Sequence, residues 1–202
     1  MACCDHDDAS HNAELVNTID LANVTCLNEV ASGSARALLR PHCARASRAA
    51  WVDSHGDDAD LLIAIPFTSA VRLRALALAA GAPPACPARA RLFVNTPGLD
   101  FETASSATPA QELLIAGPDE AGDAWHVLRG AKFNNISSLQ VLLTGNAGAR
   151  DGDAPAAVRL FYLGLRAEVT GHKGGIVHAT YEVVPQATRT RDAAGGGVAF
   201  GM

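Results

Sequence analysis

The chain has 202 residues, of which 49% are hydrophobic and 18% charged, and its formal net charge is −5. This length and apolar fraction suffice for one sizeable core, so we expect a single domain. The acidic balance gives no broad basic surface for phosphate backbones, and no apolar run approaches the roughly 18 residues of a membrane helix. We therefore expect neither nucleic acid nor a membrane as partner.

Residues 1–16 are too polar to pack, and we predict a flexible N-terminal tail without a secretory signal. The tail contains Cys3, Cys4, His6 and His11, whose side chains suit zinc, but the cysteines are adjacent and no second ligand pair follows at zinc-finger spacing. We predict no bound metal. The odd number of cysteines, five, indicates reduced thiols and a cytoplasmic location, with the nucleus left open.

The first part of the domain is irregular. Residues 17–29 contain two short apolar pieces, which predict an extended segment with Cys26 as a small buried hydrophobe. Residues 31–50 carry Gly33, Pro41 and four arginines, a composition typical of a loop with short helical turns. Four aspartates then fall within residues 53–60, yet the order of a calcium-binding EF-hand loop is absent, so we predict a solvated acidic turn.

The chain is organised around two apolar runs, residues 60–67 and 71–78, joined by three residues, Thr68 to Ala70. Two runs of strand length separated by a short polar piece predict a hairpin buried in an all-β core. Pro66 has no N–H to give to a strand ladder, so we place it at a strand end or on an edge.

Further strands follow, separated by turn signals. Residues 81–87 are rich in Gly and Pro and form a loop, residues 90–95 form a strand, and residues 99–102 form a loop. Phe101 in that loop either plugs the open end of the sheet or is an exposed contact. Residues 111–115 and 125–128 are two short strands.

The last third of the domain carries the strongest strand patterns. Residues 132–144 have apolar side chains at even spacing, which predicts a long strand with Phe133, Leu139, Val141 and Leu143 inward. Residues 158–169 are nearly continuously apolar, as in a central strand, and meet water at Arg166 and Glu168.

Gly164 within that central strand indicates close approach of another backbone or a bulge. Residues 177–183 alternate cleanly like a half-buried strand, and residues 185–202 are predicted to be a flexible tail. About nine strands without an internal repeat favour an all-β fold, a β-sandwich of the jelly-roll kind.

No sequence motif for catalysis is present. The chain lacks a Gly-x-Ser-x-Gly elbow, a Cys-x-x-Cys pair, a P-loop and a dinucleotide-binding glycine motif. The seven histidines are scattered and none lies in a His-Glu-x-x-His pattern. We therefore expect no enzyme activity, no catalytic residue and no cofactor.

A series of short motifs resembles the PITH domain, a proteasome-interacting domain also found at the C-terminus of a thioredoxin-like protein. The motifs include Ile19-Asp20-Leu21, Asp60-Leu61-Leu62-Ile63, Phe93-Val94-Asn95-Thr96-Pro97, Lys132-Phe133-Asn134-Asn135-Ile136 and Phe161-Tyr162-Leu163-Gly164-Leu165-Arg166. The resemblance covers about residues 17–184. It implies a jelly-roll β-sandwich like that of galactose-binding domains, and a stand-alone PITH protein, because no thioredoxin domain or Cys-x-x-Cys precedes the motifs.

The resemblance implies a non-enzymatic adaptor that docks on the proteasome regulatory particle. Polar or aromatic groups near predicted strand ends are the candidate contacts: Phe101, Lys132, Asn134, Asn135 and Arg166. For Lys132, Asn134 and Asn135 hydrogen bonds that cap strands are an equal alternative.

Two other functions stay open. A carbohydrate or small-ligand binding module of galactose-binding type needs aromatic platforms, and Trp51 and Trp125 are the only tryptophans. An enzyme with a metal site built from Asp53 to Asp60 is the third and least favoured hypothesis.

Overall fold

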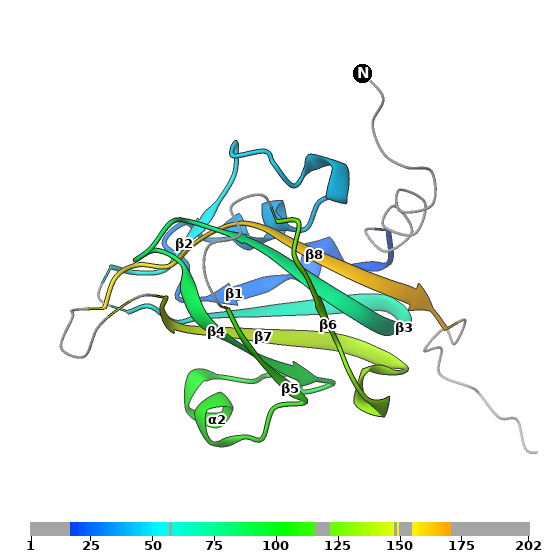
Figure 1. Cartoon of the computed structure of the whole chain (residues 1–202). Coiled ribbons are helices and arrows are strands. Elements are labelled where there is room, and N and C mark those ends of the chain that lie inside the picture. The colour runs from blue at the N-terminus through cyan, green and yellow to red at the C-terminus, as the bar shows by residue number, and fades with distance from the viewer. Residues whose placement is uncertain (1–16, 57, 116–121, 148, 150–154, 171–202) are drawn as a thin grey trace, which may run out of the picture.

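Antiparallel strands dominate the structure, a computed structural model that describes residues 17–56, 58–115, 122–147, 149 and 155–170 (Figure 1). The strands described are β1 (Thr25–Leu27), β2 (Val52–Asp53), β3 (Leu61–Ala80), β4 (Pro87–Val94), β5 (Gln111–Leu114), β6 (Trp125–Val127), β7 (Ile136–Asn146) and β8 (Arg159–Val169). They pair in the order β2-β8-β3-β7-β4-β5, and β1 and β6 also pair with β3. The predicted fold class, an all-β sandwich of the jelly-roll kind, is confirmed.

Strand β3 holds the two halves of the sandwich together, and here the predicted hairpin is wrong. Its first part, Leu61–Pro66, pairs with β7, whereas Val71–Ala80 pairs with β8, with a register shift between Pro66 and Val71. Thr68 to Ala70 include no Gly, Asn or Asp, which tight hairpin turns favour, so the chain bends and continues instead of reversing. The joint is a corner between the two halves of the sheet.

Pro66 lies inside β3, not at a strand end. It is the last residue paired with β7 before the register shift, opposite Ser138, and its carbonyl accepts a hydrogen bond from the Asp20 backbone N–H at 2.9 Å. A residue that cannot donate to the ladder fits at such an irregularity. The prediction erred in position but used the correct physical constraint.

One apolar cluster fills the space between the two halves of the sheet. Ile63 and Ile65 from the first part of β3 and Leu76 and Leu78 from the second part belong to it. All four residues predicted to point inward from the long strand are buried: Phe133, Leu139, Val141 and Leu143. That strand, β7, begins at Ile136, because residues 131–133 form the short 3-10 helix η4 (Ala131–Phe133).

Strand β8 is a central strand, as predicted, and pairs with β2 on one side and β3 on the other. Gly164 within it allows a close approach, but by a side chain instead of another backbone. A Cβ atom on Gly164 would lie 2.3 Å from the Tyr162 Oη atom. The register shifts of this strand pair lie elsewhere, at Leu73/Ala75 and Ala79/Ala80 of β3.

The connecting segments confirm two predictions and correct one. Residues 31–50 form short helical turns, η2 (Ser34–Leu38) and η3 (His42–Ala44), after η1 (Leu21–Asn23), and Cys26 in β1 packs half-buried against the core. The predicted loop at residues 99–102 instead starts helix α2 (Phe101–Ser106). Asp100 is the N-cap of this helix, because its carboxylate accepts a hydrogen bond from the Thr103 N–H at 2.7 Å. The prediction of a loop did not consider this cap.

Three predictions fall outside the described residues: the N-terminal tail at 1–16, the strand at 177–183 and the C-terminal tail at 185–202.

Candidate interaction site

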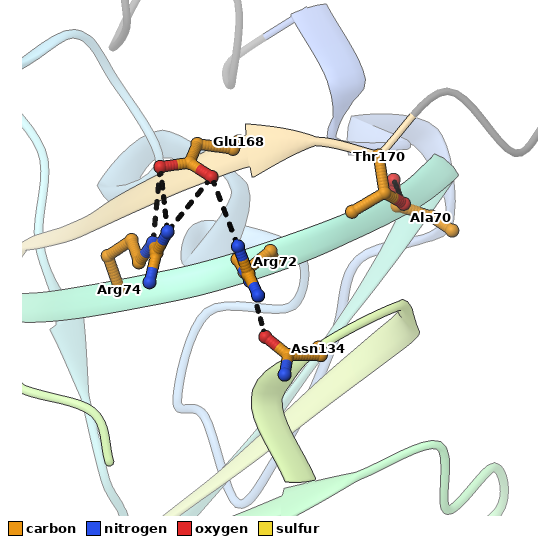
Figure 2. Close-up of polar contacts among 6 residues, drawn as sticks. All are labelled: Ala70, Arg72, Arg74, Asn134, Glu168 and Thr170. Carbon is orange, nitrogen blue, oxygen red and sulfur yellow. Dashed lines mark hydrogen bonds and ion pairs between the residues drawn. The ribbon is translucent and has the colours of Figure 1, made fainter. Parts of the chain in front are cut away.

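A cluster of polar side chains lies where the C-terminal end of β8 meets the middle of β3 (Figure 2). We call Arg72, Arg74, Asn134, Glu168 and Thr170 the rim cluster. The Nε and Nη2 atoms of Arg74 donate hydrogen bonds to the Glu168 carboxylate, both at 3.2 Å. Arg72 Nη1 lies 3.8 Å from the Oε2 atom of the same carboxylate. Arg72 Nε also donates to Asn134 Oδ1 at 2.6 Å, and Thr170 Oγ1 donates to the Ala70 carbonyl at 2.9 Å. The cluster therefore connects β3, β8 and the end of η4.

The backbone explains why two arginines reach one carboxylate. Arg72 lies opposite Glu168 in the ladder, and the register then shifts between Leu73 and Ala75, so Arg74 is an extra residue without a partner in β8. A bulge of this kind re-aims a side chain, and here it turns Arg74 back toward Glu168. The side chains of Arg72, Arg74 and Glu168 are 41%, 53% and 51% exposed, so all three meet solvent.

A second group of side chains covers the outer face of β8, the face away from the core. We call it the arginine face: five arginines layered with aromatic rings. Its members are Arg40, Arg45, Arg48, Arg159 and Arg166 with His42, Trp51, Trp125, Phe161 and Tyr162. The guanidinium carbon of Arg48 lies 4.5 Å from the ring centre of Phe161, and that of Arg166 lies 4.3 Å from the ring centre of Trp125.

Arg40 attaches the loop of η3 to β8. Its Nη2 atom donates to the Phe161 carbonyl at 2.6 Å and to the Ser47 carbonyl at 2.7 Å, and its Nε atom donates to the Ala44 carbonyl at 2.9 Å. Burial, followed by the nearby charge of Arg48, lowers the pKa of Arg40. Arg40 therefore has a structural role, because its donors are directed at the backbone.

Tyr162 forms the floor of the arginine face. It is buried, with Ala77 and Ala79 of β3 in the same small cluster. Burial raises its pKa to about 12, against the opposing effect of the nearby positive charges of Arg45 and Arg40. The hydroxyl lies 3.4 Å from His42 Nδ1. The phenol therefore stays protonated at neutral pH and serves as a packing element.

A pocket of about 390 Å³ opens at one end of this face, where β3 ends and β8 begins. It is lined by Arg48, Asp53, Gly81, Ala82, Ala85, Ala157, Arg159 and Phe161. Arg159 holds Asp53 in a two-pronged ion pair, with Nε at 2.6 Å and Nη2 at 2.7 Å, and this hydrogen bonding raises the pKa of Arg159. The pocket thus presents two guanidinium groups and one carboxylate above short apolar side chains.

The acidic segment near β2 does not bring its carboxylates together. Asp53 faces Arg159, Asp58 Oδ1 accepts from the Asp60 N–H at 2.9 Å, and Asp60 Oδ1 accepts from the Gly145 N–H at 3.3 Å. Asp57 lies outside the described residues. In the described ranges no group of three or more His, Cys, Asp or Glu residues is placed to hold a metal ion, and no helix is long and apolar enough to cross a membrane.

Comparison with known proteins decides the family. The family model described as PITH domain matches residues 5–185. The chain belongs to the PITH domain family. It is 32% identical over 169 residues to PITH domain-containing protein 1 of Xenopus laevis, covering 83% of this chain and 77% of that protein. It is 29% identical over 204 residues to PITH domain-containing protein CG6153 of Drosophila melanogaster, covering 96% and 92%.

Solved structures resemble this PITH domain in fold. One is CBM32-3 from a family 31 glycoside hydrolase of Clostridium perfringens, with a TM-score of 0.49 and 12% identity, covering 75% of this chain and 95% of that one. Another is the N-terminal domain of the single-strand break repair protein XRCC1, with a TM-score of 0.42 and 13% identity, covering 74% and 98%. Both likenesses concern the fold alone.

The PITH domain gathers some of the five predicted contact residues and separates others. Asn134 belongs to the rim cluster, and its neighbour Asn135, at a φ of 55°, accepts a hydrogen bond from Thr170 Oγ1 at 3.3 Å. Lys132 is exposed in η4, two residues before Asn134. The alternative, that the two asparagines make hydrogen bonds that cap strands, is compatible with these contacts.

Arg166 and Phe101 lie apart from that group. Arg166 is half-buried on the arginine face, two residues before Glu168 on the same side of β8. Phe101 is half-buried at the start of α2 against a separate apolar cluster that includes Phe93 and Leu142.

Sequence reasoning did not single out Arg74 or Glu168 as site residues, nor the loop arginines 40, 45 and 48. The density of arginines between residues 36 and 48 was the available signal for the second group.

Proposed function

We propose that this PITH domain is a non-enzymatic interaction module that docks on the proteasome regulatory particle through the rim cluster. The observation that carries the proposal is the exposed, charged arrangement of Arg72, Arg74 and Glu168, contributed by two strands at one end of the sandwich. Ion pairs this exposed contribute only about 0–1 kcal/mol each, so a partner can exchange its own charges for them at little cost. Membership of the PITH family supports the choice of partner.

Two of the cysteine thiols, those of Cys26 and Cys86, support a non-enzymatic role. Burial, and then the negative charge of Glu29, raises the pKa of the Cys26 thiol to about 12, so it is protonated and a poor nucleophile at neutral pH. Cys86 is buried, and burial raises its pKa as well.

The carbohydrate alternative receives less support from the two tryptophans. A sugar-binding platform requires an open aromatic ring face. Trp125 is contacted by Arg166 at 4.3 Å and by the His42 ring at 5.1 Å between ring centres. Trp51 lies 5.4 Å from the guanidinium of Arg159, and its Nε1–H donates to Asp53 at 3.1 Å. Both rings are already engaged by neighbouring side chains.

A binding experiment with purified proteasome tests the proposal. The full chain is immobilised, incubated with purified 26S proteasome at low salt, and retained regulatory-particle subunits are quantified. We compare wild type, Arg74→Glu and Arg89→Glu, because Arg89 is also an exposed strand arginine facing a cross-strand glutamate, Glu112, but lies on β4.

We expect wild type and Arg89→Glu to retain the particle, and Arg74→Glu to bind roughly tenfold more weakly, as for loss and reversal of one interfacial charge. Absence of retained subunits with wild type would refute docking. Equal retention by all three chains would refute the rim cluster as the docking surface.

A further inference from the structure

We infer that the arginine face binds an acidic segment of a partner protein and that the pocket between Arg48 and Arg159 receives one carboxylate side chain of that segment. The inference rests on the proposed function only in treating the chain as a protein-interaction module. It concerns a different surface from the rim cluster and a stated chemistry of the partner.

The charge of this face differs in sign from that of the whole chain. Arg45 pairs with Asp123, and Arg159 pairs with Asp53. Neither Arg40 nor Arg48 has a carboxylate of the described segments within ion-pair distance. Four of the five arginines of the face thus meet two carboxylates of the described residues, an excess of positive charge in a chain whose net charge is −5. A local field of this sign attracts an acidic partner.

The pocket supplies hydrogen-bond donors with the geometry that a carboxylate requires. Arg48 directs Nη1 at the carbonyls of Arg45 and Ser47, at 3.2 and 3.4 Å, whereas its Nε and Nη2 atoms donate to no atom of the described chain. Arg159 uses Nε and Nη2 for Asp53, which leaves its Nη1 donors without a partner among the residues described. A guanidinium edge binds a carboxylate with two parallel hydrogen bonds, and stacking of Arg48 over Phe161 fixes the plane of that edge.

The same features favour a carboxylate of a protein over the backbone of a nucleic acid. Asp53 in the pocket wall limits the net positive charge that the pocket offers to an anion. The excess of positive charge on the arginine face is small, and aromatic rings separate its arginines. Binding of a phosphate backbone instead uses a row of unpaired lysines and arginines. The remaining wall is short apolar side chains, including Ala82 and Ala85, which suit the methylene groups of a glutamate.

Fluorescence anisotropy with the full chain tests the inference. The probe is a short fluorescein-labelled peptide of glutamate residues, and the comparison probes are a glutamine peptide of the same length and a single-stranded oligonucleotide with the same number of charges. We expect binding of the glutamate peptide only, weakened by added salt because the exposed charges are screened. Arg48→Ala should weaken it about tenfold, the size of one lost charge-assisted contact.

Two further variants control for damage to the loop around η3. Ala82→Glu places a carboxylate at the exposed edge of the pocket without touching that loop, and it should weaken binding at least as much as Arg48→Ala. Arg89→Ala removes one positive charge from β4 and should bind like wild type.

The inference is overturned by absence of salt-sensitive binding, by wild-type affinity of both Arg48→Ala and Ala82→Glu, or by tighter binding of the oligonucleotide than of the peptide. Proteasome retention without peptide binding would remove this inference and leave the proposed function standing. Peptide binding without proteasome retention would do the reverse.

Discussion

Replacing Gly164 by alanine tests the packing beneath the arginine face. Gly164 does not have a positive φ, so alanine fits the backbone and, in an open strand position, would stabilise it by about 0.5–1 kcal/mol. In this chain the added Cβ would lie 2.3 Å from Oη and 2.7 Å from Cε1 and Cζ of Tyr162. The ring is only 1% exposed, so it has no solvent to move into.

The expected cost follows from these distances. Overpacking of a buried site costs about 1–3 kcal/mol, and the gain in strand propensity offsets part of it, so Gly164→Ala should lower the free energy of unfolding by about 1–2 kcal/mol. Tyr162→Leu lacks all three of the ring atoms that meet the new Cβ. In that background the same Gly164→Ala change should be neutral or slightly stabilising, which gives a coupling energy of about 2 kcal/mol.

Urea unfolding followed by circular dichroism measures all four chains of this cycle, with midpoints compared at a constant m-value. Gly56→Ala is the matched control, because a Cβ there meets no atom within 4 Å and the residue is exposed. It should change stability by less than about 0.5 kcal/mol. If Gly164→Ala lowers the free energy of unfolding equally in wild type and in the Tyr162→Leu background, the Tyr162 ring does not occupy the space over Gly164.

Three further predictions concern ionisable groups. Burial raises the pKa of Tyr162 from 10.0 to about 12, so the tyrosine of the unfolded state ionises first as the pH rises. The free energy of unfolding should therefore be unaffected below pH 10 and fall by up to about 3 kcal/mol between pH 10 and pH 12. Urea midpoints measured as a function of pH check this prediction. The Tyr162→Phe variant should lose less stability between pH 10 and pH 12 than wild type, and an equal loss in both chains would contradict the prediction. At mildly alkaline pH, iodoacetamide should label the exposed Cys43 well before Cys26, whose pKa is about 12. Peptide mapping by mass spectrometry measures the two labelling rates, and faster labelling of Cys26 would refute its burial. Glu168→Gln should lower the free energy of unfolding by less than about 1 kcal/mol, with the difference fading in high salt, and a salt-independent loss above about 2 kcal/mol would mean that the rim cluster is structural.

The sequence was most informative about strands whose side chains alternate around a core. The even spacing of Leu139, Val141 and Leu143 located β7 and its buried face, because one side of that strand meets the core along its length. The same reasoning failed for β3, where a local pattern contains no information about which strand lies opposite. Thr68 to Ala70 resembled a hairpin connection, but the pairing partners, β7 before them and β8 after them, come from the far end of the chain.

The site residues were harder to predict, since they depend on register and on distant contacts. The resemblance to the PITH family identified Asn134 as a candidate contact residue. Its hydrogen bond with Arg72 could not be predicted in the same way, because the two residues are 62 positions apart in the chain. The meeting of Arg74 with Glu168 depends on the register shift at Leu73/Ala75, for which the sequence has no marker. The arginines of residues 40–48 have no periodicity, and the contact that fixes them to β8 spans 121 positions.

The alanines of β3 explain how an almost entirely apolar strand can lie beneath an arginine-rich surface. Leu76 and Leu78 face the core, whereas Ala77 and Ala79 face outward beneath Tyr162. Side chains this small leave room for the ring to lie over the sheet. A second sheet is therefore not needed to cover this face, because the aromatic layer shields it and the guanidinium groups lie above that layer in contact with water.

The rim cluster and the pocket of the arginine face lie at the two ends of one strand, and the distance between them limits what a single partner segment can reach. Glu168 of the rim cluster and Arg159 of the pocket belong to the outer side of β8, at its two ends. About nine residues separate them, which at roughly 3.3 Å per residue is about 30 Å. A fully extended partner segment needs a similar number of residues to contact both surfaces at once. Peptides shorter than this engage one surface at a time, so the affinities of the rim cluster and of the pocket should be separable, and only a longer acidic segment should gain from both.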